Sequence, residues 1–319
     1  MTDLTSSAVP PAAPTTADKS QFDSSSARKQ WQVIARRFLR HRAAVVGVGI
    51  FVVLVLFAFL GGVFWKYSYT DLGFQRYQNP TADHPFGTDR LGADMVSQII
   101  RGMQFSLQIA LVVALVSTVI GVVLGALAGY KGGWVDTAIS RFIDLLLVIP
   151  AFVIAAVLVR NSFVATATGS NNGGSNWLVV ALYLGLIGWL SIARVIRGMV
   201  LSLREKEFVE AARALGASTS RIIFRHILPN TVDVIIVNAT LAIAQAVLLE
   251  AALSFIGLGV HSPDTSLGLM ISLNKNELNL HPWLFLIPFL FIVLISLSVN
   301  FIGDGLRDAF DPRQKRVKA

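Results

Sequence analysis

The chain contains no cysteine and few charged residues for its length. Among 319 residues, 14% are Asp, Glu, Lys or Arg, whereas soluble domains carry about a quarter. The absence of cysteine excludes disulfide bonds, thiolate metal sites and a cysteine nucleophile. The five histidines are scattered, and none has a metal-binding spacing such as H-E-x-x-H. We therefore expect no metal site and no catalytic site in this chain.

The sequence also lacks the phosphate-binding loop G-x-x-x-x-G-K-[ST] of many ATP-binding domains. The only Lys followed by Ser or Thr is Lys19, and no glycine precedes it. We expect the chain to be neither an ATPase nor any other enzyme, and to hold no cofactor of its own.

What the chain does contain is long apolar sequence, since 54% of its residues are hydrophobic. A helix needs about 20 apolar residues to cross a membrane, and six segments qualify. The third is the weakest because Arg141 and Asp144 lie in its first turns, where a spacing of three favours a pair on one helix face. We expect an all-α integral membrane protein, with the first run retained as a span and not cleaved as a signal peptide. The predicted spans are 43–65, 105–130, 138–159, 177–193, 232–256 and 283–303.

The distribution of Lys and Arg predicts the orientation of these spans. If the N-terminus is cytoplasmic, 21 of the 27 Lys and Arg residues lie in cytoplasmic segments, as the positive-inside rule favours. Both termini are then cytoplasmic. The net charge of +8 reflects topology and lipid headgroups, so nucleic acid is not an expected partner.

The domain organisation follows from the spans. The first residues are rich in Ser, Thr, Ala and Pro and lack the apolar content to fold. The predicted segments are a disordered cytoplasmic tail 1–30, a basic juxtamembrane segment 31–42, a six-span domain 43–306 and a basic cytoplasmic tail 307–319. The six-span domain includes an extracytoplasmic loop 66–104 and a cytoplasmic loop 194–230.

Two sets of residues within the spans are candidates for packing or function. Gly121, Gly125 and Gly129 form a small-xxx-small stripe that would let another helix approach closely, although glycine is common in membrane helices anyway. Polar residues in a span are costly and often functional. The fifth span contains three candidates for a translocation path, and their spacing only partly supports a shared polar face. These candidates are Asn238, Gln245 and Glu250.

The cytoplasmic loop contains the stretch EFVEAARALGASTSRIIFRHILPN, residues 207–230. Good helix formers end at Gly216, a residue typical of a helix C-terminus, and a second helix can begin at a Ser or Thr cap and end before Pro229. Helices this short are marginal alone in water, so we expect another protein to hold them. An ordinary amphipathic helix at the membrane surface is the alternative.

This stretch resembles the EAA loop of ABC importer permeases. Glu210, Ala211 and Ala212 are followed after three residues by Gly216 and later by Leu228 and Pro229, as in that family. His226 departs from the family pattern, which has Ile at this position. The resemblance implies the type I ABC importer permease fold, whose first short loop helix docks on a cytosolic ATPase. The implied coupling residues are Glu207, Glu210, Ala211, Ala212, Arg213, Gly216 and Pro229.

Three further stretches resemble the C-type permease subunit of dipeptide and oligopeptide importers. They are HPFGTDRLGADMVSQIIRG at 84–102, ALSFIGLGVHSPDTSLGLMI at 252–271 and VNFIGDGLRDAFDPR at 299–313. The implied partners are a homologous B-type permease, two ATPase domains that bind ATP and Mg²⁺, and an extracytoplasmic solute-binding protein. The implied place is the inner or plasma membrane, and the implied cargo is a peptide.

Two alternatives stay open at this point. The same architecture could import a non-peptide cargo such as haem, a nickel complex or glutathione. More distantly, the chain could be a channel or a membrane scaffold that works without ATP. The loop 66–104 could receive the binding protein, form a lid or support the pore.

Overall fold

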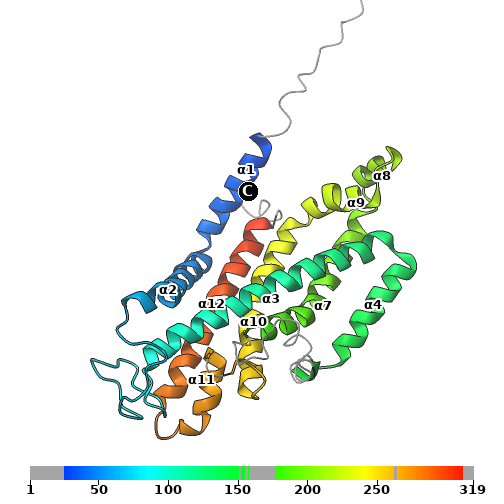
Figure 1. The fold of residues 1–319 in the computed structure, drawn as a ribbon. Coiled ribbons are helices and arrows are strands. Elements are labelled where there is room, and N and C mark those ends of the chain that lie inside the picture. The colour runs from blue at the N-terminus through cyan, green and yellow to red at the C-terminus, as the bar shows by residue number, and fades with distance from the viewer. Residues whose placement is uncertain (1–24, 151, 155–156, 158–176, 262–263, 312–319) are drawn as a thin grey trace, which may run out of the picture.

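The computed structural model describes residues 25–150, 152–154, 157, 177–261 and 264–311. Over these residues the chain is a bundle of helices (Figure 1), and their β-type pairing is limited to one isolated bridge between Thr88 and Asp94. Five described helices are long and apolar enough to cross a membrane, which confirms five of the six predicted spans. They are α2 (Arg42–Phe64), α3 (Met95–Lys131), α7 (Trp177–Leu203), α10 (Val232–Phe255) and α12 (Trp283–Phe310).

The third predicted span, 138–159, coincides in part with α4 (Gly133–Val148). At 16 residues, α4 is shorter than the roughly 20 that a span requires. Most of the prediction beyond residue 154 lies outside the described residues, so a sixth span stays a prediction. Trp134 and Val148, near the two ends of α4, are more than four-fifths exposed.

Three boundaries differ from the sequence analysis. Helix α3 begins at Met95 because the Asp94 carboxylate accepts a hydrogen bond from the Ser97 N–H at 2.9 Å and caps it. The predicted loop 66–104 therefore contains ten residues of helix. The sequence did not indicate this helical part of the span, because polar side chains interrupt the apolar pattern of its first turns. Helix α1 (Ser25–Arg40) begins inside the tail predicted to be disordered, and α12 continues past residue 306 to Phe310.

The N-terminal helix α1 contacts the C-terminal end of α12, which is distant in sequence. The Arg37 guanidinium donates to the Asp311 carbonyl at 3.1 Å, beyond the last turn of α12. His41 separates α1 from α2, and its Nδ1 accepts the Ala44 N–H at 3.1 Å as the cap of α2. The predicted juxtamembrane segment is therefore helical and packs against the end of α12.

Helices α3 and α7 make the most extensive helix–helix contact among the described residues. A Cβ placed on Gly121 would lie 2.8 Å from the Ile192 side chain, and one on Gly129 would lie 2.7 Å from the Arg197 carbonyl oxygen. Between them, Gly125 faces Ala193 in the same way. The glycine stripe thus lies directly against the α7 backbone.

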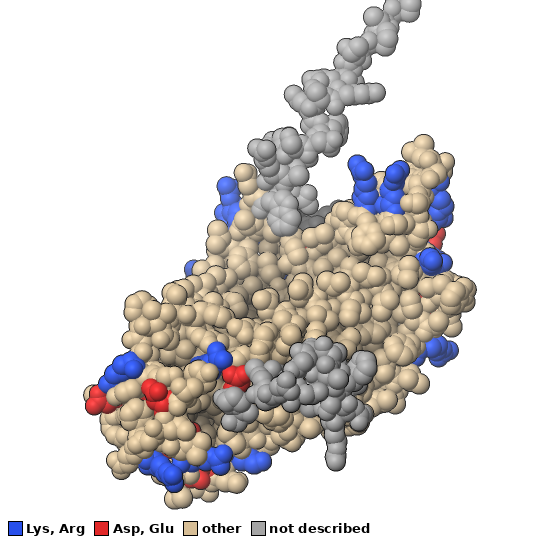
Figure 2. All heavy atoms as spheres, in the orientation of Figure 1, with Lys and Arg blue, Asp and Glu red and all other residues tan. Residues whose placement is uncertain are grey.

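The two ends of the bundle differ in charge. One end carries α1, the end of α12 and a hairpin of short helices, and the other carries the loop 65–94 and α11 (Figure 1). Lys and Arg side chains gather at the hairpin end, whereas both signs of charge mix at the other (Figure 2). The short elements are α8 (Glu207–Ala214), α9 (Thr219–Ile222), a π-helix (Ile223–Ile227), a 3-10 helix (Leu228–Asn230), α11 (Leu267–Asn274) and a second 3-10 helix (Lys275–Glu277).

Candidate functional site

The EAA stretch folds into the predicted pair of helices joined by a tight turn. Gly216 has φ +77°, a conformation that side chains with a Cβ rarely adopt, and its N–H donates to the Arg213 carbonyl at 3.0 Å. The Ala217 N–H donates to the Ala212 carbonyl at 3.0 Å, which completes the turn. Ser218 then caps α9 by accepting the Arg221 N–H.

The inner face of this hairpin packs on the chain itself. Val209 is fully buried and Ala212 is 7% exposed. Both belong to an apolar cluster that joins the second arm of the hairpin to α3 and α7, so the expectation that another protein must hold these helices is wrong for this face. The other buried members are Val122, Ala126, Ile192, Ile196, Val200, Ile222, Ile223 and Ile227.

The outer face of α8 combines charged and apolar side chains. Leu215 at the tip is 89% exposed, and Phe208 is 41% exposed. Five of the predicted coupling residues on α8 and its turn share this exposure, whereas Ala212 is turned inward. The exposed ones are Glu207, Glu210, Ala211, Arg213 and Gly216, and Pro229 is exposed in the second arm.

Glu250 lies at the centre of a buried polar network. Its side chain is fully buried, with Oε1 accepting from Ser254 Oγ at 2.7 Å and Oε2 accepting from Ser106 Oγ at 3.2 Å. Ser254 Oγ is in turn 3.4 Å from Ser266 Oγ, which caps α11. We call Glu250, Ser106, Ser254 and Ser266 the Glu250 network. Among the described residues, no Lys, Arg or His forms an ion pair with Glu250.

The three polar candidates on α10 do not share a face. Glu250 is buried toward α3 and α11, whereas Gln245 is exposed. Asn238 is half-buried, bonds the Val234 carbonyl of its own helix, and borders a cavity of about 420 Å³ between α7, α10 and α12. At 100° per residue, five and twelve residues turn a helix by roughly 140° and 120°, which separates Glu250 from the other two side chains. Asn238 and Gln245 are seven residues apart and lie within about 20° of each other around the helix.

Two ion pairs join α4 to α7 in place of the pair expected within the third span. Arg197 donates to both carboxylate oxygens of Asp136, with the Nη2–Oδ2 distance at 2.7 Å. Arg194 donates to Asp144 at 2.7 Å, so the predicted Arg141–Asp144 pair is wrong. Because both partners lie on another helix, no local spacing indicated them.

The loop 65–94 contains an aromatic cluster around a second buried carboxylate. Asp94 is fully buried and accepts from Trp65 Nε1 and from the His84 ring, both at 2.8 Å. The His84 ring stacks on Tyr67 with centroids 4.8 Å apart. On the loop surface, Lys66 Nζ lies 2.6 Å from Asp83 Oδ1. This ammonium group holds the pKa of the Asp83 carboxyl below its usual range.

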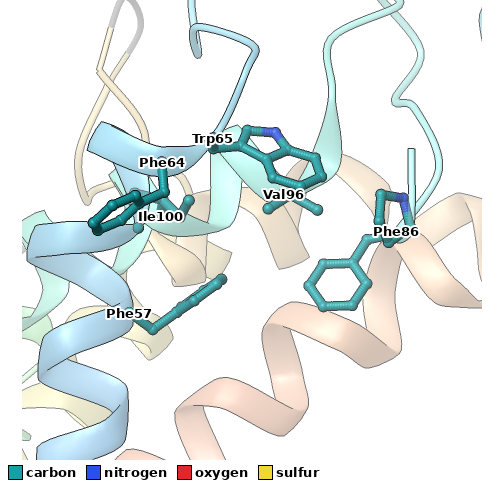
Figure 3. Close-up of a pocket in the computed structure, with 8 residues that line it drawn as sticks. Phe57, Phe64, Trp65, Phe86, Val96 and Ile100 are labelled. Carbon is teal, nitrogen blue, oxygen red and sulfur yellow. The ribbon is translucent and has the colours of Figure 1, made fainter. Parts of the chain in front are cut away.

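Beside this cluster lies an apolar pocket of about 340 Å³ (Figure 3). Phe57 and Phe64 come from α2, Phe86 comes from the loop, and Val96 and Ile100 come from α3. No charged side chain lines this pocket, so it offers nothing to orient a polar ligand. Among the described residues, no group of three or more His, Asp or Glu is placed to hold a metal ion.

Two family models match most of the chain. Residues 121–316 match the family model for the binding-protein-dependent transport system inner membrane component. Residues 29–82 match the model for the N-terminal TM domain of oligopeptide transport permease C. Together the two matches cover α2, α7, α10, α12, the hairpin and Glu250, whereas most of α3, with Ser106, lies between them.

Curated relatives are similar over nearly their whole length. The chain is 40% identical over 287 residues to the oligopeptide transport system permease protein OppC of Mycobacterium tuberculosis strain H37Rv, covering 90% of this chain and 96% of the relative. It is 39% identical over 291 residues to the protein of the same name from Escherichia coli K12, covering 90% and 93%. An inward-facing structure of the MetNI methionine ABC transporter matches with a TM-score of 0.51 at 21% identity, covering 68% of this chain and 98% of that one, which supports the fold.

Proposed function

Because the chain belongs to the family of binding-protein-dependent transport system inner membrane components, we propose that it is a permease subunit of an ATP-driven oligopeptide importer. The observation that carries this proposal is the 40% identity to an oligopeptide permease across 90% of the chain. The chain is a multi-pass inner-membrane protein, and it would form half of the translocation path beside a homologous permease.

The exposed face of α8 is the proposed contact with the ATPase subunits. It pairs an acidic residue, Glu210, with the apolar tip residue Leu215, and exposed apolar side chains at a rigid tip are typical of protein interfaces. Since the inner face of the hairpin is fixed to α3 and α7, a force applied to α8 would move those spans directly. ATP and Mg²⁺ would bind to the partner subunits.

Orientation and delivery complete the proposal. The gathering of Lys and Arg at the hairpin end supports a cytoplasmic hairpin and cytoplasmic termini. The loop 65–94 would then face the solute-binding protein, which delivers the peptide. Asn238, which is half-buried, and Gln245, which is exposed, remain candidates for contact with the path, and they lie on the same side of α10.

Uptake of labelled dipeptide and pentapeptide tests this proposal in cells that lack other peptide importers. Deletion of the gene should abolish uptake and the wild-type chain should restore it. Glu210→Lys should reduce uptake by at least about tenfold with an unchanged amount of protein in the membrane. Glu205→Lys is the matched control, because Glu205 is exposed and pairs with Arg204 just outside α8.

The outcomes separate the alternatives. Peptide uptake that survives deletion would reject the peptide cargo, and competition by haem, a nickel complex or glutathione would then identify the cargo class. Equal uptake in the Glu210 and Glu205 variants would reject α8 as the coupling surface. Purification without ATPase subunits would favour a channel or scaffold.

A further inference from the structure

The first turn of α11 packs closely against both α3 and α10. A Cβ on Gly268 would lie 2.6 Å from Ala251 Cα on α10, and one on Gly102 of α3 would lie 3.2 Å from the Leu267 nitrogen. Leu267 is fully buried and Met270 is 4% exposed. This helix of eight residues packs against α3, α10 and α12 at the end of the bundle that carries the loop 65–94 (Figure 1).

The Glu250 network connects this N-terminus to a carboxylate. The Leu267 N–H, in the first turn of α11, donates to Ser106 Oγ at 3.4 Å, and Ser106 donates to Glu250. The Leu269 N–H donates to Ser266 Oγ at 3.1 Å, and Ser266 lies next to Ser254, which donates to Glu250. Two chains of hydrogen bonds thus lead from the first N–H groups of α11 to the two oxygens of one carboxylate.

This arrangement gives the buried Glu250 carboxyl hydrogen-bonding partners at a place where no described Lys, Arg or His pairs with it. The first N–H groups of a helix have no partner within the helix, and their end of the helix dipole is positive. The serine hydroxyls extend that positive end to Glu250. The network is satisfied only while α11 stays in place, because removing one member leaves a buried polar group without its partner.

We propose that Glu250 is a positioning residue of the transport cycle, which holds α11 between α3 and α10 and releases it when this end of the bundle opens. The link to transport rests on the proposed function, whereas the hold on α11 does not. An interface made of hydrogen bonds on a buried carboxylate is suited to opening, because water can replace the serine donors once α11 moves away.

The absence of cysteine allows a direct test with single introduced cysteines. We would place Met270→Cys on the buried face of α11 and measure its reaction with a membrane-impermeant maleimide, in vesicles that contain the whole transporter. In the resting wild type the reaction should be slow. Glu250→Gln should accelerate it by at least about tenfold, and Ser106→Ala should act in the same direction.

Three controls make the result specific. Leu273→Cys, 46% exposed on the same helix, shows that the reagent reaches this end of the protein. Ile196→Cys, buried on α7, should stay unlabelled in every variant that keeps its fold. Ser117→Ala should have no effect, because the one partner of this buried α3 serine among the described residues is the Ala114 carbonyl of its own helix.

Each outcome decides the question. A Met270→Cys rate that is unchanged by both Glu250→Gln and Ser106→Ala overturns the hold on α11. If Glu250→Gln also exposes Ile196→Cys, that variant has lost its fold and Ser106→Ala decides.

A second comparison tests the link to transport. Addition of ATP and peptide-loaded binding protein should accelerate Met270→Cys labelling in the wild type, and an unchanged rate during measured uptake overturns the release of α11. If no peptide uptake occurs at all, the proposed function fails, and the resting comparison still stands.

Discussion

Arg197 on α7 donates to both carboxylate oxygens of Asp136 on α4, across 61 residues of sequence. Their side chains are 30% and 18% exposed, so this pair is largely shielded from water. Ile143 is the one described residue of α4 that is buried. The ion pair is therefore a principal connection between α4 and the rest of the bundle.

Asp136→Asn should weaken this connection and destabilise the protein by about 2 kcal/mol, because it leaves the guanidinium without its charged partner in a shielded position. The apparent melting temperature of the purified chain measures the change. Asp144→Asn is the matched control, since its pair with Arg194 is more than half exposed on both sides and should contribute less than about 1 kcal/mol. Equal shifts in melting temperature for the two variants would contradict the larger contribution of the shielded Asp136–Arg197 pair.

The contact between α3 and α7 gives a second prediction. Gly125→Ala should destabilise the protein by about 1 to 3 kcal/mol, because the added Cβ would lie 3.0 Å from Ala193 Cα and closer still to its carbonyl oxygen. Thermal unfolding in detergent measures it. Gly198→Ala on α7 has nothing within 4 Å and should be neutral or slightly stabilising, so a similar loss in both variants would show that helix packing is not the cause.

These two contacts illustrate what the sequence could and could not predict. The spans follow from hydropathy, because no other structure hides so much apolar sequence, and the glycine stripe follows from its four-residue spacing. The pairing of Asp136 with Arg197 could not be predicted, because it depends on which helices become neighbours. The same holds for Glu250, whose serine partner on α3 is 144 residues away.

Local signals also conflicted at the start of α3. Helix α3 begins at Met95 although Gln98, Arg101 and Gln104 interrupt the apolar pattern of its first turns. The Asp94 cap and the contact of Arg101 with Asp264 at 3.0 Å accommodate these polar residues. Which side of α10 faces the bundle could not be predicted either. Its own apolar residues lie on all sides of the helix, so no polar stripe indicates the exposed side.

Asp94 gives a third prediction, on the stability of the loop 65–94. Asp94→Ala should destabilise the protein by about 3 kcal/mol or more, because it removes the α3 cap and leaves the half-buried Trp65 donor and the buried His84 donor without an acceptor. The amount of folded protein in the membrane and its melting temperature report the loss. Asp83→Asn, which breaks only an exposed pair with Lys66, should leave both unchanged, and a comparable defect there would contradict the role of burial.

Gly216 gives the last prediction, on coupling. At φ +77° with open space around it, this position restricts the backbone conformation and not the size of the side chain. Asn adopts positive φ more readily than other residues with a side chain, whereas a β-branched residue strongly resists it. Gly216→Asn should therefore keep near-wild-type peptide uptake, and Gly216→Val should reduce it several-fold, because the turn opens and α8 presents Glu210 and Leu215 at a different angle. Both variants should reach the membrane in normal amounts, since Val209 and Ala212 still pack on α3 and α7. Equal uptake by the Asn and Val variants would show that the turn does not set the direction of α8.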